Sequence, residues 1–339
     1  MGFSSSNKIG EGGFGSVYKD ATWVGVDSVV GLNPMQGRLQ DGRLVAVKVL
    51  SGESKQGDRE FISEIASMAN VRHENLVKVH GGCIDGGCRM LVYEYMENNN
   101  LAQTLLGEEK NREKFSWKAR VEVAIGIARA LAFIHEEVKP HIVHRDIKAT
   151  NILLDGNFCP KVSDFGLSKL FPDNVTHLST RVAGTLGYLA PEYAISGHLT
   201  RKSDVYSFGV LLLEIVSGRS AIDFDLELGE HFLVEKAWVM YKADGLLQLV
   251  DPLLNNSFSQ REALTFLKVG LSCVQETCRL RPHMSTAVRM MRDEIDTDGL
   301  DISRPGLITS ITDVKIGGGR SSQSSRSHTP SPRFYWFGL

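Results

Sequence analysis

Eight consecutive residues combine the side chains that a phosphoryl transfer to an alcohol requires. They run from His144 to Asn151 and read His-Arg-Asp-Ile-Lys-Ala-Thr-Asn. A carboxylate such as Asp146 can orient an attacking hydroxyl and accept its proton. Lys148 can meet the charge of the transferred group, and Asn151 offers an amide oxygen to Mg²⁺. A loop of unrelated polar residues is the alternative, and three matching roles within these eight positions argue against it.

A second magnesium ligand is predicted 13 residues after Asn151. Asp164 begins an Asp-Phe-Gly tripeptide, and a carboxylate is a hard oxygen ligand suited to this ion. The tripeptide alone is common and gains its meaning from this position. An Ala-Pro-Glu tripeptide follows at 190–192. By itself it would indicate only a helix that begins at a proline.

The beginning of the chain contains glycines that could approach the phosphates of a nucleotide. Gly10, Gly12 and Gly15 form a Gly-x-Gly-x-x-Gly pattern. A backbone without Cβ atoms can bring its N–H groups close to phosphate oxygens. The alternatives are a dinucleotide site and a flexible hairpin. Val17, and the lack of a helical pattern directly after it, favour the phosphate loop of a phosphotransferase.

A lysine in the next strand pattern is a candidate for contacting these phosphates. Lys48 ends the run Val-Ala-Val-Lys, and Glu64 lies in a segment with apolar residues at helical spacing. An ion pair between the two would hold the ammonium group against the α- and β-phosphates. A solvated surface lysine is the alternative that the strand pattern leaves open.

The elements that must position these residues fall into two parts. Strands are predicted over 44–50, 77–80 and 90–93, with a helix over 59–71 between them. From residue 101 onward the pattern is mainly helical. The segment 117–134 has a continuous apolar stripe, and 204–216 is apolar almost all round, which is typical of a helix buried inside its lobe.

These motifs occur in the order found in eukaryotic protein kinases, and the chain resembles that family over residues 8–292. Within the family it is similar to plant receptor-like kinases of the Pelle and interleukin-receptor-associated type. The segments that carry this similarity are GTLGYLAPEY at 184–193 and SDVYSFG at 203–209. The nearest similarity is to cold-responsive receptor-like cytoplasmic kinases.

The resemblance implies an α+β, bilobal protein kinase fold. Residues 8–96 would form an N-lobe with a small antiparallel β-sheet and one helix. Residues 97–292 would form the larger, mainly helical C-lobe. Residues 1–7 would be an N-terminal extension. Residues 293–339 are predicted to be a disordered tail, because serine and glycine dominate its composition.

The resemblance also implies a site for ATP with Mg²⁺, or with Mn²⁺ as an alternative ion. The residues that would bind ATP are Ile9, Gly10, Gly12, Gly15, Val17, Ala46, Lys48, Glu94, Met96 and Leu153. Among them, Glu94 to Met96 would form the hinge beside the adenine, behind Tyr93. Asn151 and Asp164 would hold the metal. Asp204 would brace the backbone of the catalytic loop, and Arg281 would pair with Glu192.

The substrate and the regulation are predicted from the same loop. Lys148 and Thr185 imply serine or threonine acceptors on protein substrates, with autophosphorylation included. Arg145 would be an unpaired cation until phosphorylation of the segment between Asp164 and Glu192 supplied an anion. The candidate residues are Thr176, Ser179, Thr180 and Thr185, with Thr180 as the main one.

One segment departs from the family pattern. Residues 20–36 read as an insertion of 17 residues into the second strand. It is either a regulatory element or translated non-coding sequence, and the second interpretation is favoured. Because this strand supports the phosphate loop, a catalytically impaired pseudokinase or scaffold is the alternative to an active serine/threonine kinase in plant signal transduction. An oxidoreductase built on the glycine pattern is rejected, because it gives residues 144–151 no role.

Composition limits the partners and the cellular compartment that we expect for the protein. A net charge of −2 lacks the positive excess that is typical of nucleic-acid-binding proteins. The five cysteines include no Cys-x-x-Cys pair, which favours a reducing compartment. No apolar run approaches the ~18–20 residues of a membrane helix, so we expect a cytoplasmic protein without a transmembrane segment. The first six residues fit the loose myristoylation pattern. Peripheral attachment to the plasma membrane and a membrane receptor kinase as partner are further hypotheses.

Overall fold

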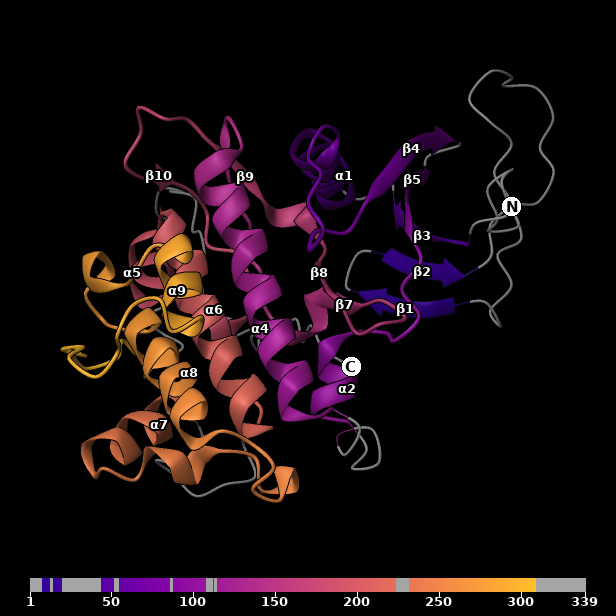
Figure 1. Cartoon of the computed structure of the whole chain (residues 1–339). Coiled ribbons are helices and arrows are strands. Elements are labelled where there is room, and N and C mark those ends of the chain that lie inside the picture. The colour runs from indigo at the N-terminus through magenta and orange to yellow at the C-terminus, as the bar shows by residue number, and fades with distance from the viewer. Residues whose placement is uncertain are drawn as a thin grey trace, which may run out of the picture.

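The computed structural model describes residues 8–12, 15–19, 44–51, 55–85, 88–107, 112, 115–223 and 232–308, with only the backbone of residues 8–12, 15–19, 51 and 85. Figure 1 shows two lobes, with the indigo and violet strands on the right and the helices α5 to α9 on the left. This architecture confirms the predicted α+β, bilobal fold. The segment 20–36 and residues 309–339 lie outside the described residues.

The N-lobe contains one antiparallel sheet of five strands in the order β1-β2-β3-β5-β4. The strands are β1 (Lys8–Gly12), β2 (Gly15–Lys19), β3 (Val45–Ser51), β4 (Val79–Asp85) and β5 (Cys88–Glu94), and the helix α1 (Lys55–Met68) lies between β3 and β4 in the chain. β2 pairs with β3 along its whole length, as far as Lys19 opposite Ala46. The described part of the second strand is therefore intact, and the segment 20–36 follows it.

The two faces of β3 have different neighbours. Alternate residues of a strand point to opposite faces of its sheet. Val45 and Val47 are buried in a small cluster with Met90 and Val92 of β5. Lys48 lies on the other face, where the sheet packs against α1 and the main core. The alternation along this strand thus directs the lysine toward the helix that carries its predicted partner.

The C-lobe is built mainly from helices. These are α2 (Leu101–Leu105), α4 (Trp117–Ala132), a π-helical turn (Phe133–Glu137), α5 (Pro191–Ser196), α6 (Arg201–Ser217), α7 (Leu233–Lys242), α8 (Gln260–Cys273) and α9 (Met284–Met291). Short 3₁₀ turns occur at Ala149–Asn151, Phe165–Leu167, Leu186–Tyr188, Leu246–Leu249, Pro252–Leu254 and Cys278–Leu280.

Three pairs of short antiparallel strands shape the loops of the C-lobe. β6 (His141–Val143) pairs with β9 (Lys169–Phe171), and β7 (Ile152–Leu154) pairs with β8 (Pro160–Val162). β10 (Leu178–Ser179) pairs with β11 (His198–Leu199). β6 and β7 flank the predicted catalytic loop, and β8 leads directly to Asp164, so these pairings fix both motifs at their ends.

The helix α6 runs through the middle of the C-lobe, and every residue from Ser203 to Ser217 is buried. It begins after Thr200, which forms a capping box with Ser203. It ends at Gly218, whose φ of 63° is the left-handed conformation that glycine adopts at little cost. The nearly uniform apolar pattern predicted this buried helix, and its few polar residues must find partners inside the core.

Residues 293–308 correct the predicted start of the disordered tail. Ile302 is buried, and the N–H of Gly306 donates to the carbonyl oxygen of Val274 (3.0 Å). Tyr206 of α6 donates its hydroxyl to the carbonyl oxygen of Gly306 (2.7 Å). Backbone hydrogen bonds and apolar side chains packed against the core hold this segment in place, which its serine- and glycine-rich setting did not reveal, and so the prediction was wrong for it.

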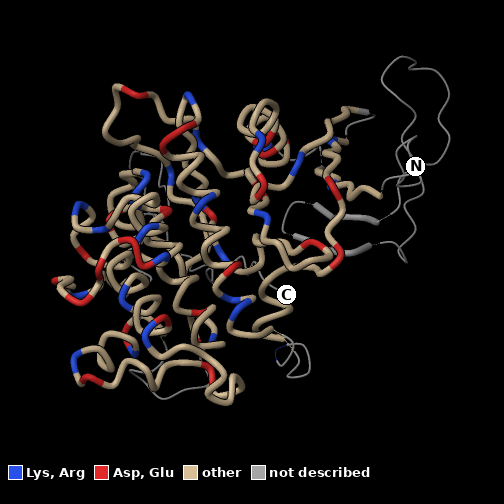
Figure 2. Tube along the Cα trace, in the orientation of Figure 1, with Lys and Arg blue, Asp and Glu red and all other residues tan. Residues whose placement is uncertain are grey.

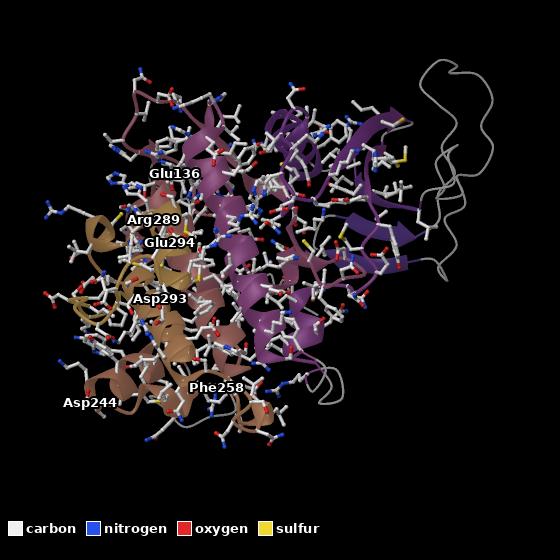
Figure 3. The ribbon with its side chains drawn as sticks, in the orientation of Figure 1. Glu136, Asp244, Phe258, Arg289, Asp293 and Glu294 are labelled. Carbon is white, nitrogen blue, oxygen red and sulfur yellow. The ribbon has the colours of Figure 1, made fainter. Side chains whose placement is uncertain are left out.

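Two ion pairs hold the turn after α9, and Figure 3 labels three of their residues, Arg289, Asp293 and Glu294. Arg289 pairs with Glu294 (3.5 Å), and Arg261 of α8 pairs with Asp293 (2.9 Å). Figure 2 shows that acidic and basic residues alternate over both lobes without a large field of one sign. No helix in the described ranges is long and apolar enough to cross a membrane.

Candidate active site

A buried carboxylate on α6 holds the backbone of the catalytic loop. Asp204 accepts the N–H of His144 at Oδ2 (2.7 Å) and the N–H of Arg145 at Oδ1 (2.8 Å). Its Oδ2 also lies 2.8 Å from Nε2 of His135. Burial acts to raise the pKa of Asp204, but His135 and these N–H groups outweigh burial and lower it. Asp204 thus fixes the backbone of the loop that carries Asp146 to α6.

Asp146 lies in a cluster of four polar side chains. Its Oδ1 accepts the hydroxyl of Thr185 (2.8 Å), and its Oδ2 accepts the amide N–H of Asn151 (3.0 Å). Lys148 lies 3.1 Å from Oδ2 and also donates to Oγ1 of Thr185 (2.9 Å). The carboxylate that could accept a proton therefore already binds an alcohol, beside an ammonium group that could meet a phosphoryl group.

The second charged cluster joins the two lobes. Nζ of Lys48 lies 2.6 Å from Oδ1 of Asp164 and 3.4 Å from Oε2 of Glu64. Burial acts to lower the pKa of Lys48, but the charges of Asp164 and Glu64 outweigh it and raise this pKa above its usual value. Burial acts to raise the pKa of Asp164, and the Lys48 charge outweighs it and lowers the pKa. Burial raises the pKa of Glu64 against the Lys48 charge, so the ion pair of this cluster at neutral pH is the one between Lys48 and Asp164.

The helix α1 is held against the Asp-Phe-Gly segment by its serines. Ser67 shares a hydrogen bond with the hydroxyl of Ser168 (2.7 Å), and Ser63 donates to the carbonyl oxygen of Ser168 (2.8 Å). The N–H of Phe165 donates to Glu64 (3.3 Å). These contacts keep Glu64 turned inward, and sequence patterns gave no signal for the serines because their partners lie about a hundred positions away.

The residues predicted to hold Mg²⁺ have suitable chemistry. The Asp164 side chain is 45% exposed, and from a backbone with a φ of 64° it reaches Lys48 of the N-lobe. Asn151 uses its amide N–H groups on the Asp146 carbonyl oxygen (2.8 Å) and Oδ2, which leaves its oxygen as the coordinating atom. The described residues contain no group of three His, Cys, Asp or Glu that could hold a metal alone. Asp164 and Asn151 would supply two oxygen ligands, and Mg²⁺ commonly takes the others from nucleotide phosphates and water.

The structure describes the side chains of only some of the predicted ATP-binding residues. Ala46 and Leu153 are half-buried and Met96 is buried. The Glu94 carboxylate is engaged by other residues: it accepts the N–H of Lys78 (2.7 Å) and lies 3.4 Å from Nζ of Lys161. Its remaining contribution to a hinge is through the backbone. The side chains of the other predicted residues on β1 and β2, Ile9 and Val17, lie outside the described part, as do side-chain details around Gly10, Gly12 and Gly15.

Arg145 is not the unpaired cation that the sequence predicted. Its Nε and Nη2 donate to Oη of Tyr193 (3.1 and 2.6 Å), Nη1 donates to the carbonyl oxygen of Leu167 (2.9 Å), and Nη2 donates to that of Arg181 (2.7 Å). The prediction was wrong because Tyr193 is 48 positions away in sequence. All three acceptors are neutral, and so the site still has no counter-ion of its own within the described residues.

The predicted regulatory residues lie in the activation segment, which we define as residues 164–192. Thr176 and Ser179 are exposed, and Thr180 is half-buried. The N–H of Thr180 donates to the carbonyl oxygen of Gly197 (3.0 Å), which continues the β10–β11 pairing. Thr185 differs from the other three, because its hydroxyl is bound to Asp146 and Lys148.

A buried acid–tyrosine pair underlies the end of the activation segment, and the sequence patterns missed it. Tyr188 donates its hydroxyl to Oε2 of Glu214 (2.6 Å), and the N–H of Ala221 donates to Oε1 (2.7 Å). Burial raises the pKa of Glu214 to about 7, against these hydrogen bonds, which lower it. A single acidic residue in an otherwise apolar stretch of α6 was the available signal.

A bidentate ion pair anchors the Ala-Pro-Glu motif. Arg281 donates to both carboxylate oxygens of Glu192, each at 2.8 Å. The guanidinium also lies over the ring of Tyr206, 5.0 Å from its centre. The structure therefore brings Arg281 and Glu192 together as the sequence pattern implied, and the pair fixes the start of α5 on the C-lobe.

A small sheet lobe, a helical lobe and two charged clusters between them define the class: a nucleotide-dependent phosphotransferase of the protein kinase type. Comparison with known proteins agrees. Residues 3–291 match the family described as protein tyrosine and serine/threonine kinase. The chain belongs to this family.

Relatives of known name specify the kind of kinase. Cold-responsive protein kinase 1 of Arabidopsis thaliana is 51% identical over 335 residues, which cover 97% of this chain and 82% of that protein. A probable LRR receptor-like serine/threonine-protein kinase of the same plant is 50% identical over 293 residues, which cover 86% of this chain and 27% of that protein. The chain thus spans about a quarter of this longer relative. It is a serine/threonine protein kinase similar to plant receptor-like kinases.

Proposed function

We propose that the chain transfers the γ-phosphate of ATP to serine or threonine hydroxyls of proteins, including its own, with Asp146 as the proton acceptor. The observation that carries this proposal is the cluster of Asp146, Lys148, Thr185 and Asn151, whose polar atoms lie 2.8–3.1 Å apart. A phosphoryl transfer depends mainly on positioning and on electrostatic stabilisation, and this cluster provides both.

Each side chain of the cluster has a distinct part. Asp146 would orient the attacking hydroxyl and accept its proton, as it now accepts the proton of Thr185 in a hydrogen bond. Lys148 would neutralise charge on the transferred group. Asn151 keeps the Asp146 carboxylate in place through its amide N–H. Because Asp146 is only 9% exposed, water competes weakly for these interactions.

ATP supplies the phosphoryl group, and Mg²⁺ would neutralise its phosphates. Lys48, held between Glu64 and Asp164, is proposed to contact the α- and β-phosphates. Asp164 and Asn151 are proposed to hold the metal. Gly10, Gly12 and Gly15 lie in the paired strands β1 and β2, and β2 pairs with the strand that carries Lys48, which supports a role for this hairpin at the phosphates.

Acceptor type follows from Thr185 and Lys148. Thr185 donates to the Asp146 carboxylate and accepts from Lys148, so the backbone at Thr185 lies beside this carboxylate. An acceptor must therefore present its hydroxyl close to this backbone, which suits the short side chains of serine and threonine. Thr180 is proposed as the main regulatory phosphorylation site, because it directly precedes Arg181, whose carbonyl oxygen binds Arg145.

We further propose a setting in plant signal transduction, because the relatives named above are plant receptor-like kinases. The proposed location is the cytoplasm. Attachment to the inner face of the plasma membrane through the Gly2 pattern, and a membrane receptor kinase as partner, belong to the same proposal.

The test uses the full chain with labelled ATP, Mg²⁺ and three peptides that differ only in a serine, threonine or tyrosine acceptor. Asp146→Asn removes the proton acceptor. Asp298→Asn makes the same chemical change at a carboxylate that is 84% exposed and pairs with Lys268. We expect label on the serine and threonine peptides from the wild type and from Asp298→Asn. Label on the tyrosine peptide alone, or equal label from Asp146→Asn, would contradict the proposal.

A further inference from the structure

The hydroxyl of Tyr193 connects the catalytic loop to the activation segment. Tyr193 lies on α5 and is only 1% exposed. Its Oη accepts N–H groups from Arg145 (3.1 and 2.6 Å) and from Ala183 (3.0 Å), and it donates to the carbonyl oxygen of Arg181 (3.2 Å). One buried hydroxyl therefore binds the residue beside Asp146 and two backbone groups of the activation segment.

The charge of Arg145 makes this hydroxyl more than a packing contact. Arg145 is 8% exposed, and the acceptors of its N–H groups are the Tyr193 hydroxyl and the carbonyl oxygens of Leu167 and Arg181. Its guanidinium carbon lies 5.7 Å from the centre of the Tyr193 ring. In the part of the chain that the structure describes, no carboxylate pairs with it. A nearly buried cation with neutral partners depends strongly on each of them.

We propose that Tyr193 is a positioning residue that holds the activation segment on the catalytic loop before any phosphate is attached. This inference rests on the kinase function proposed above. Toward Arg145, the hydroxyl takes the place that a phosphate on Thr180 would take, because Thr180 adjoins Arg181. The unphosphorylated enzyme therefore has a basal activity that depends on Tyr193. The phosphorylated enzyme does not depend on it, since a phosphate gives Arg145 stronger, charge-assisted hydrogen bonds.

Tyr193→Phe isolates the hydroxyl, because it keeps the ring and its contact with Arg145. The change leaves buried N–H groups of Arg145 and Ala183 without their acceptor, so the activation segment detaches more readily. We expect the dephosphorylated variant to phosphorylate a serine peptide about 10- to 100-fold more slowly than the dephosphorylated wild type. After phosphorylation the two rates should agree within about twofold, because the phosphate replaces the lost acceptor.

The experiment compares two forms of each protein. One form is treated with a phosphatase that is then removed, and initial rates are taken before autophosphorylation proceeds. The other form is phosphorylated by wild-type kinase immobilised on beads, and mass spectrometry measures the occupancy of Thr176, Ser179 and Thr180. Tyr206→Phe is the matched control, since it removes another buried tyrosine hydroxyl, which donates to the Gly306 carbonyl oxygen (2.7 Å). The control should follow the wild type in both forms.

A loss confined to the dephosphorylated Tyr193→Phe supports the inference. An equal loss in both forms, which a general structural role would produce, overturns it, and so does no loss. If the wild type does not exceed Asp146→Asn in either form, the proposed kinase function fails and this inference fails with it. Hydrogen exchange provides a second test should the variant prove unstable. The Ala183 amide of dephosphorylated wild type should be protected, and exchange at the rate of a free loop would overturn the inference.

Discussion

Replacing Asp204 by asparagine should loosen the catalytic loop and lower the free energy of unfolding. The carboxylate now accepts two backbone N–H groups, from His144 and Arg145, and binds His135. An amide has one oxygen, which can keep His144 and His135 at the Oδ2 position. Its NH₂ group would then face the N–H of Arg145, so that donor meets donor inside the core.

The expected size follows from these contacts. One charge-assisted hydrogen bond is lost, at about 1.5–3 kcal/mol, and a buried N–H is left unsatisfied, at about 1–3 kcal/mol. We therefore expect the free energy of unfolding to fall by about 3–5 kcal/mol, a large part of the stability of a typical domain. We expect kcat for a serine peptide to fall by about tenfold or more, because the displaced N–H belongs to the neighbour of Asp146.

Urea unfolding at pH 7.5 measures the first effect, and peptide phosphorylation by the folded fraction measures the second. Asp298→Asn is the control, since it converts an exposed aspartate. The folded-state pKa of Asp204 is lowered, so its contribution is present above the unfolded pKa of about 4 and is lost as the pH falls through the folded value. The difference from wild type should therefore persist at neutral pH and close only in acid. Unfolding free energies within about 0.5 kcal/mol of each other at pH 7.5 would refute the reasoning.

Two further predictions concern the same lobe. The raised pKa of Glu214, about 7, means that the folded state binds a proton more tightly than the unfolded state, so stability should fall as pH rises from about 4.5 to 7. Glu214→Gln, which imitates the protonated acid beside Tyr188, should remove this dependence and raise the free energy of unfolding at pH 8 by on the order of 3 kcal/mol. Free energies of unfolding in urea that depend on pH in the same way for wild type and Glu214→Gln would contradict this prediction. Gly197→Ala should lower stability by about 1–2 kcal/mol, because φ is 75° and the new Cβ would lie 2.7 Å from the Thr180 carbonyl oxygen. Thermal unfolding measures this effect, and Gly299→Ala, where a Cβ meets nothing within 4 Å, is the control; equal midpoints would contradict the prediction.

The catalytic loop could be predicted because its chemistry fixes residue types at short spacing. Asp146, Lys148 and Asn151 lie within six positions, and the structure brings them into one cluster with Thr185. The lobes could be predicted for a related reason. The spacing of apolar residues indicates how much of each strand or helix is buried. In α6 nearly every position is apolar, which predicted a helix buried on all sides.

The contacts that fix the loop could not be predicted, because they join residues far apart in sequence. His135 meets Asp204 across 69 positions, and Tyr193 meets Arg145 across 48. No local period specifies such pairs, and a tyrosine in α5 could equally serve in packing. The segment 293–308 was mistaken for part of the tail for a different reason. Backbone hydrogen bonds and scattered apolar side chains hold it on the C-lobe, and neither forms a period along the sequence.

The account depends most on Asp146 as the proton acceptor, and one comparison tests it directly. The rate of phosphate transfer to a serine peptide at saturating ATP and Mg²⁺ is measured for wild type, Asp146→Asn and Asp298→Asn, with ATP binding measured separately by fluorescence. We expect Asp146→Asn to bind ATP as the wild type does and to transfer phosphate about 10²- to 10⁴-fold more slowly, while Asp298→Asn is unchanged. Transfer by folded, ATP-binding Asp146→Asn at the wild-type rate would contradict the account.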